Sequence, residues 1–447
     1  MHHVNSPLDI LPSVIDDPDD ARPPMPVPTL RARAAARIRG LAIDLSPLRV
    51  SRDYRLLWIG EMVSHTGRHI SVVALPYQIF VLTDSTLAVG MLGLVQFVPL
   101  IIFSIIGGAI ADAMDRRRLL AWTQVGLTAG SLMLVGGAIA GDPPLWFLYL
   151  TAGIIAALSG LDAPARTAAI PGLVPKGKLA AAIALNFGVF QASDVIGPAV
   201  GGLIIARAGL AWAYGIDAFT FLVALYTVWR MRPMPPQHEG QEPARGFRSV
   251  REGFAYLRGR RVLQSTFWID LNAMVFGMPR AVFPALALVH FRVGPAGLGL
   301  LYAAPAAGAV LGLLSSGWVN RVRRQGRAVL WAVAAWGAAI AVFGITPFWL
   351  GLILLAVAGW ADIVSAVLRS TILQQTVPDR LRGRLSSIHF AVVVGGPRLG
   401  DVEAGVVAHL FTPTISVISG GLACIAGAGV IALLIPQLAR YHAGEEA

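Results

Sequence analysis

The sequence is poor in the residues that carry covalent chemistry and charge. Its 447 residues include one cysteine, and only 14% of them are charged. The lone Cys424 cannot form an internal disulfide, and we interpret it as a small core residue. No group of histidines and cysteines has the spacing of metal ligands, so we expect no metal and no cofactor. The phosphate-cradling motif G-x-x-x-x-G-K-[ST] and the nucleophile motif G-x-S-x-G are absent, which argues against an ATP-driven pump and against an enzyme.

Long apolar runs occupy most of the chain. Hydrophobic residues make up 55% of it, and the mean hydropathy is +0.66. About twelve runs hold roughly 20 or more mostly apolar residues, which is enough for a helix to cross a ~30 Å hydrocarbon core. We therefore predict an all-α polytopic membrane protein with 12 transmembrane helices. The runs are residues 56–82, 88–111, 119–140, 145–168, 181–206, 211–229, 263–290, 296–318, 328–346, 348–373, 385–410 and 414–436.

The basic residues gather on one side of these predicted spans. Of the 36 lysines and arginines, 29 lie in the termini and in alternate gaps, 2 lie in the opposite gaps, and the rest lie inside spans. This bias places both termini in the cytoplasm. The arginine- and alanine-rich, lysine-poor composition suggests a GC-rich bacterial genome, so we predict a bacterial plasma (inner) membrane protein. The net charge of +11 then reflects topology and anionic lipid headgroups, so we expect membrane lipids and no nucleic acid as partners.

The gaps also divide the chain into parts. We predict a cytoplasmic tail with a basic amphipathic segment, an N-terminal six-helix bundle, a cytoplasmic linker with an interfacial helix, a C-terminal six-helix bundle and a short cytoplasmic tail. In this order they cover residues 1–50, 51–230, 231–262, 263–437 and 438–447. The segments ARTAAIPGLVP and LRSTILQQTVP resemble each other at a separation of 203 residues, which predicts two pseudo-symmetric bundles around a central cavity.

The first basic gap inside the membrane region reads GGAIADAMDRRRLL, residues 107–120. It resembles the loop signature of the major facilitator superfamily, in which a Gly and an Asp precede a basic cluster. The resemblance implies that Gly108 lets two helices approach closely. It also implies that Asp112, followed by Arg116, meets the N-terminus of the eleventh span and leaves it when the cytoplasmic side opens. The sequence departs from the signature at Ala113, where the family has a basic residue, and at Asp115, where it usually has a glycine.

A longer stretch, residues 161–204, resembles the fourth and fifth spans of the enterobactin-exporter-like branch of this superfamily, which includes siderophore and multidrug exporters. The similarity continues into VPDRLRGRLSS, residues 377–387, and covers about residues 51–436. It implies the major facilitator fold, transport by alternating access and a monomer. It does not name the substrate, because one fold hosts many cargoes.

Two features of this stretch are gating candidates. Asp162 and Arg166 stand four residues apart on one helical face, so we predict an ion pair that is either a cytoplasmic gate or a static bridge. Arg369, which matches Arg166 in the repeat, and Arg384 join them as candidates.

The second feature is a Gly- and Pro-rich run in the fifth span. Gly197, Pro198 and Gly201 match the last part of the superfamily's antiporter signature, whereas Ser193 and Ala184 stand where it has glycines. Such a run gives either a kinkable gating surface or ordinary close helix packing.

Charges inside the spans are costly unless they are paired or face water. Arg68 in the first span and Asp194 in the fifth lie at similar depths, and the resemblance implies that these two spans pack side by side, so we predict an ion pair between them. Arg398 in the eleventh span has two candidate partners, Asp401 one turn away and Asp270 on the seventh span.

Proton coupling needs a carboxylate or histidine whose protonation differs between the inward- and outward-facing states. Asp194 and Asp401 are the first candidates, and Glu61 and His65 follow, although each could belong to a structural ion pair that never titrates. We expect the face of the first span that carries Glu61, His65 and Arg68 to line the cavity, and Arg280 and His290 to lie near the outer surface. The cavity candidates are Arg68, Arg398, Asp270, Asn186, Gln191, Asn272, Phe190, Trp268, Phe276 and Trp360.

These observations favour a proton-coupled secondary active exporter, an antiporter that moves an amphiphilic organic small molecule such as a siderophore or a drug. Two alternatives stay open. A lipid or lysolipid flippase of the same fold would have a cavity open to lipid, and a non-transporting membrane sensor or scaffold would not depend on the intramembrane charges.

Overall fold

The computed structural model describes residues 44–235, 255–377 and 379–442, and the side chains of 320, 379–384, 386–388, 390, 391 and 394 are outside this description. All the described helices belong to one unit that begins at Leu45. The basic N-terminal segment and most of the linker that we predict lie outside the described residues.

Long helices account for most of the described chain, and ten are long and apolar enough to cross a membrane. The helices of the first half are α2 (Ser46–Val50), α3 (Arg52–Thr83), α4 (Thr86–Ala113), α5 (Arg116–Ala140), α6 (Leu145–Leu173), α7 (Leu179–Ala208) and α8 (Leu210–Trp229). Those of the second half are α10 (Arg261–Phe276), α11 (Phe283–Ala285), α12 (Gly294–Ser315), α13 (Gln325–Phe343), α14 (Phe348–Thr376), α15 (Asp379–Leu410), α16 (Pro413–Leu434) and α17 (Pro436–Arg440).

The all-α polytopic membrane fold is confirmed, and the count of 12 spans stays a prediction. Helices α3 and α15 are each 32 residues long but are not among the ten apolar ones. Both carry the charged groups that the sequence places inside spans, among them Arg68 and Arg398, and these lower their hydropathy.

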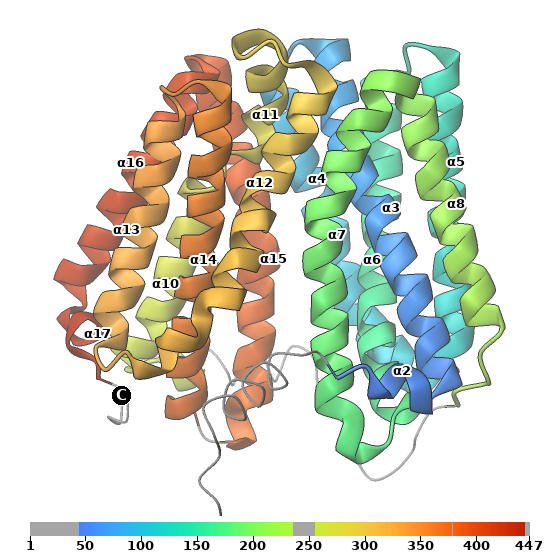
Figure 1. The fold of residues 1–447 in the computed structure, drawn as a ribbon, viewed down its shortest axis with the longest axis horizontal. Helices are drawn as coiled ribbons and strands as arrows, with labels where there is room; N and C mark the ends of the chain where they lie inside the picture. Colours follow the sequence, from blue (N-terminus) through green and yellow to red (C-terminus); the bar gives the residue numbers. More distant parts are fainter. Residues whose placement is uncertain (1–43, 236–254, 378, 443–447) are drawn as a thin grey trace, which may run out of the picture. The chain divides into compact units, whose positions relative to one another are not determined.

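The long helices form two bundles, one from α3–α8 and one from α10–α16 (Figure 1). In the first bundle α4 packs on α6, and α8 packs on α3 and α5; in the second, α12 packs on α14, and α13 packs on α14 and α16. The bundles meet mainly where α7 packs on α12 and where α4 packs on α15.

Glycines close the two bundles against each other at one end. A Cβ on Gly202 of α7 would lie 2.8 Å from the Cα of Gly299 of α12. A Cβ on Gly90 of α4 would lie 3.1 Å from the Cα of Gly405 of α15 and 2.6 Å from a backbone oxygen. Only glycine allows this backbone approach. The hydroxyl of Thr86 also donates to the carbonyl of Gly405 at 3.2 Å across this contact.

Exposed tryptophans mark both ends of the helices. Side chains of this kind favour the boundary between lipid and water, so two girdles of them are typical of a membrane protein. The tryptophans that are at least 64% exposed fall into two groups. Near the end where α3 begins lie Trp122, Trp229 and Trp331, and near the opposite end lie Trp146, Trp212 and Trp349.

Candidate functional site

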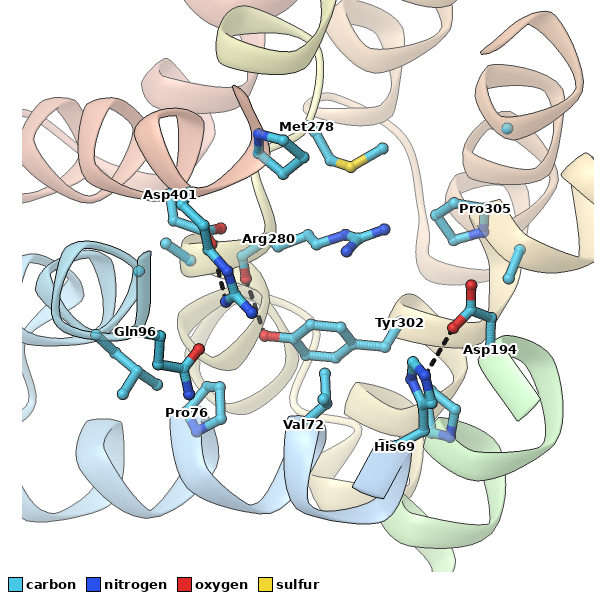
Figure 2. Close-up of a pocket in the computed structure, with 18 of the residues that line it drawn as sticks. His69, Val72, Pro76, Gln96, Asp194, Met278, Arg280, Tyr302, Pro305 and Asp401 are labelled. Carbon is cyan, nitrogen blue, oxygen red and sulfur yellow. Dashed lines mark hydrogen bonds and ion pairs between the residues drawn. The ribbon is translucent and has the colours of Figure 1, made fainter. Parts of the chain in front are cut away.

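A cavity of about 420 Å³ lies between the two bundles. Helices α3, α4 and α7 line it from one side, and α12, α14, α15 and the segment after α10 line it from the other (Figure 2). Its wall is mostly apolar, and acidic and basic side chains from both bundles reach it: His69, Asp194, Arg280, Asp362, Arg398 and Asp401. Mostly apolar walls with a few convergent polar groups are typical of sites that bind an organic molecule.

Asp194 pairs with His69 across α3 and α7. The distance from His69 Nε2 to Asp194 Oδ1 is 2.8 Å. This corrects our expectation of an Arg68–Asp194 pair. Consecutive residues on a helix point about 100° apart, so only one of the two can face α7. Arg68 points into its own bundle, with its guanidinium 6.0 Å from the centre of the Phe221 ring.

Arg398 pairs with one of its two expected partners. Its Nη1 lies 3.8 Å from Asp401 Oδ2, one turn along α15. Asp270 lies elsewhere, because Arg369 of α14 holds it at 2.7 Å in the core of the second bundle. Its second oxygen is 3.9 Å from Nδ1 of His389. The expectation that Asp270 joins the cavity is therefore wrong, since that carboxylate is fully buried and is not among the lining residues.

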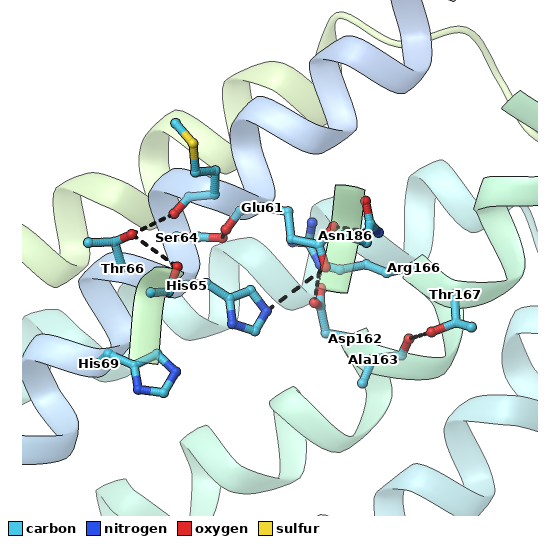
Figure 3. A network of polar contacts seen from close by, with 12 residues as sticks. Glu61, Ser64, His65, Thr66, His69, Asp162, Ala163, Arg166, Thr167 and Asn186 are labelled. Carbon is cyan, nitrogen blue, oxygen red and sulfur yellow. Dashed lines mark hydrogen bonds and ion pairs between the residues drawn. The ribbon is translucent and has the colours of Figure 1, made fainter. Parts of the chain in front are cut away.

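A second polar cluster fills the interior of the first bundle (Figure 3). Asp162 forms the expected ion pair with Arg166, and both side chains are buried. Thr123 Oγ1 and Gln124 Nε2 of α5 donate to Asp162 Oδ1 at 2.7 and 2.8 Å. The carboxylate therefore has both a cation and two neutral donors around it, as a buried charge requires.

Glu61 belongs to this cluster. The amide of Asn186 donates to Glu61 Oε2 at 3.1 Å, and His65 Nε2 lies 4.0 Å from Oε1. The hydroxyl of Tyr54 donates in turn to Asn186 Oδ1 at 3.0 Å. Glu61, His65 and Arg68 are not among the cavity-lining residues, so our expectation that this face of α3 lines the cavity is corrected. It faces the interior of its own bundle, toward α7 at Glu61 and toward α8 at Arg68.

Three titratable residues, Asp217, Asp362 and His69, are not among those predicted from the sequence. A fourth, Arg280, lies elsewhere than predicted. Asp217 of α8 is buried and accepts hydrogen bonds from Ser71 Oγ at 2.6 Å and Ser131 Oγ at 3.0 Å. Asp362 lines the cavity, and so does Arg280, which we expect near the outer surface. The rule that intramembrane charges are costly would have found both aspartates; His69 carries no such signal.

Of the remaining residues that we expect in the cavity, one lines it and the others lie elsewhere. Gln191 lines the cavity, whereas Asn186 and Phe190 contact the Glu61 cluster, the latter with its ring 4.3 Å from that of His65. Asn272 donates to the carbonyl of Cys424 at 2.9 Å, and Trp360 donates to Ser315 Oγ at 3.0 Å.

Two further aromatic candidates lie away from the cavity. Trp268 is 58% exposed on α10, and Phe276 packs against the main hydrophobic core, to which both bundles contribute.

The gating candidates from the loop signature take different positions. A Cβ on Gly108 would meet nothing within 4 Å, whereas one on Gly107 would lie 2.9 Å from the Cα of Leu161. The close approach of α4 and α6 is therefore at Gly107 rather than at Gly108. Asp112 lies 4.0 Å from Arg116, whose Nη1 donates to a carbonyl of α6 at 2.9 Å.

The candidates of the antiporter run lie along α7. A Cβ on Gly197 would lie 2.3 Å from the Cβ of His69, and one on Gly201 would lie 2.9 Å from the Cα of Ile70, so both glycines pack on α3. Pro198 lines the cavity. The side chain of Arg384 lies outside the described residues.

Two helical bundles that share a cavity at their interface form the architecture of a membrane transporter. The sequence family described as "Transmembrane secretion effector", within the major facilitator superfamily, matches residues 42–445, and the chain belongs to that family. It is similar to the enterobactin exporters EntS of Citrobacter koseri and of Shigella boydii serotype 18. Each is 28% identical over 401 residues, which cover 90% of this chain and 96% of the relative. The resemblance seen in the sequence is confirmed.

Solved structures share the fold. A POT family transporter in complex with 5-aminolevulinic acid aligns with a TM-score of 0.69 and 12% identity, covering 87% of this chain and 97% of that one. A bacterial homologue of the lysosomal transporter Spinster aligns with a TM-score of 0.66 and 17% identity, covering 87% and 96%. The protein is a multi-pass secondary transporter of the major facilitator fold.

Proposed function

We propose that the protein is a proton-coupled exporter of an amphiphilic organic molecule, in the class of siderophores, across the bacterial inner membrane. The observation that carries this proposal is the cavity itself, which takes walls from both bundles and ion pairs from each of them. The siderophore class comes from the names of the relatives, which are enterobactin exporters.

The contacts between the bundles suggest how access would alternate. The glycine contacts of α7 with α12 and of α4 with α15 close the end at which α4 and α12 begin. The basic bias of the connecting segments supports a topology with this end on the outer side and both termini in the cytoplasm. Rocking the bundles apart at these contacts would open the cavity outward, and the protein would work as a monomer because each chain holds both halves.

Two carboxylates in the cavity are suited to couple protons to this motion. Asp194 pairs with His69 within the first bundle, and Asp401 pairs with Arg398 within the second. A substrate that competes for either partner would change the environment of the carboxylate, and a proton could then replace the lost counter-charge. Both carboxylates therefore rank above Glu61 and His65, which lie in the cluster inside the first bundle.

Proteoliposomes with an imposed pH gradient and an internal pH dye test the proposal. We expect externally added enterobactin to evoke a proton flux in the wild type, and Asp194→Asn or Asp401→Asn to abolish it. Asp142→Asn is the control, because this residue lies exposed between α5 and α6. Substrate movement without proton flux would favour a facilitator or a flippase. Unchanged activity in both cavity variants would contradict the assigned coupling.

A further inference from the structure

The seventh predicted span is broken where it reaches the cavity. Helix α10 ends at Phe276, and a short 3-10 turn, Arg280–Val282, follows before α11 and a π-helical turn. The break contains Pro279, and the next turn contains Pro284. Neither residue has an N–H to donate, so the i to i−4 ladder cannot run through this part of the span. Backbone carbonyls at the break then need other donors inside the membrane.

Side chains from two other helices supply these donors. Trp336 Nε1 of α13 donates to the carbonyl of Gly277 at 2.8 Å, and the hydroxyl of Tyr302 of α12 donates to the carbonyl of Arg280 at 3.2 Å. A Cβ on Gly277 would lie 3.0 Å from Trp336 Nε1, so the break also depends on glycine. It is a fixed part of the fold that sets the position of Arg280.

The Arg280 side chain extends into the cavity, between Met278 and Pro305 (Figure 2). Among the described residues, no carboxylate lies within 4.0 Å of its guanidinium, and this guanidinium donates no hydrogen bond. The other basic side chains of the cavity differ, since His69 contacts Asp194 and Arg398 contacts Asp401. Asp362 and Asp401 interact with this guanidinium electrostatically, from beyond 4.0 Å. Its hydrogen-bond donors therefore stay open to a molecule that enters the cavity, and an unsatisfied guanidinium at this depth is costly without one.

We propose that Arg280 is the anion-recognition residue of this cavity and that the transported molecule is an amphiphilic organic anion. A carboxylate, or another anion with two oxygens side by side, accepts two parallel hydrogen bonds from a guanidinium. The apolar body of the molecule would lie against Val72, Leu75 and Pro305. This inference rests on the proposed function, because it names the substrate class of the same cavity.

Binding in lipid nanodiscs tests it with a matched pair of probes, pyrenebutyrate and its methyl ester, by energy transfer from tryptophan to pyrene. We expect the wild type to bind the acid at least about tenfold more tightly than the ester, since charge-assisted hydrogen bonds are worth this much. Arg280→Gln should remove the preference and leave the affinity for the ester unchanged. Arg207→Gln, which removes a charge from the exposed last turn of α7, should keep it.

A charge-rescue experiment tests whether the positive charge at position 280, rather than the shape of the side chain, gives the preference for the acid. The only cysteine, Cys424, is buried, so a thiol introduced by Arg280→Cys is the accessible one. An aminoethyl methanethiosulfonate should restore the preference for the acid, and the sulfonatoethyl reagent should not. The proposal is overturned if the wild type shows no preference for the acid, whether both probes bind or neither does. It is also overturned if Arg280→Gln keeps the preference or if both reagents act alike.

The liposome experiment keeps this inference distinct from the proposed function. Enterobactin-dependent proton flux in the wild type, together with an acid preference that survives Arg280→Gln, would leave the exporter standing and remove the anion site. An acid preference that depends on Arg280, without any proton flux, would support the anion site and contradict the proton-coupled exporter.

Discussion

The two bundles keep an arginine at matching positions but provide its counter-charge differently. Arg166 and Arg369 stand 203 residues apart, on α6 and α14. In the first bundle the partner is Asp162, four residues earlier on the same helix. In the second bundle that position is Ser365, which accepts a hydrogen bond from Arg369 Nη1 at 3.0 Å. The carboxylate comes instead from Asp270 on α10, at 2.7 Å.

This difference changes what each ion pair holds together. A pair within one helix survives any movement of that helix against its neighbours, whereas a pair between two helices joins them. The first bundle links its own first helix to α7 through a hydrogen bond from an amide to a carboxylate, from Asn186 to Glu61 at 3.1 Å. The second bundle makes its link between α10 and α14 with full charges. The comparison predicts that the second bundle is more sensitive to loss of its carboxylate.

Removing that carboxylate should have the largest effect. Asp270→Asn removes the carboxylate that contacts the buried guanidinium of Arg369 and leaves only the more distant Asp362, and breaking such a pair costs about 3–5 kcal/mol. Asp162→Asn should cost less, because the pair that it breaks lies within one helix and does not join α6 to another helix by charge. Chemical unfolding in detergent, followed by tryptophan fluorescence, measures both variants. An equal loss in the two bundles would remove the distinction between them.

A relocated carboxylate sharpens the same comparison. Ser365→Asp in the Asp270→Asn background gives Arg369 a partner four residues earlier on its own helix, as Asp162 is to Arg166. If charge is what the arginine needs, this double variant should regain more than half of the lost stability. If it stays as unstable as Asp270→Asn, then the link between α10 and α14 matters more than the charge.

The contacts between the bundles give an intermediate effect. Gly202→Ala places a methyl group 2.8 Å from the Cα of Gly299, and overpacking of this kind costs about 1–3 kcal/mol. This cost falls only on the state in which α7 and α12 touch, so the populations should shift toward the state open at that end. A membrane-impermeant maleimide should then label Gln96→Cys in the cavity faster from that side. Gly188→Ala is the control, since a Cβ there meets nothing within 4 Å.

Much of the fold could be predicted from the sequence, because apolar length and the cost of intramembrane charge act on each span separately. Asp162 and Arg166 could be paired since helical spacing alone puts them on one face. Arg398 and Asp401 follow the same rule. Such local geometry needs no knowledge of which helices are neighbours.

Contacts between helices could not be predicted in the same way. His69 rather than Arg68 meets Asp194 because of the rotation of α3 about its own axis, which no single-span pattern defines. Arg280 reaches the cavity because the span breaks at Pro279, and depth counted at 1.5 Å per residue assumes an unbroken helix. Asp270 pairs with Arg369 because of how helices pack inside the second bundle. The prediction of two bundles does not define which helices within a bundle are neighbours.

The loop signature gives the smallest expected effect and tests whether a resemblance carries over residue by residue. The resemblance assigns the close approach of helices to Gly108, whereas the structure places it at Gly107, where a Cβ would lie 2.9 Å from the Cα of Leu161. Gly107→Ala should therefore destabilise the protein by about 1 kcal/mol or more through overpacking. Gly108→Ala should be neutral or stabilising by up to about 1 kcal/mol, because alanine is the better helix former. Thermal unfolding of both variants in the same detergent decides between them. Should Gly108→Ala prove the more damaging, the signature glycine must pack in another conformation of the transport cycle, one in which α4 and its partner lie closer than they do here.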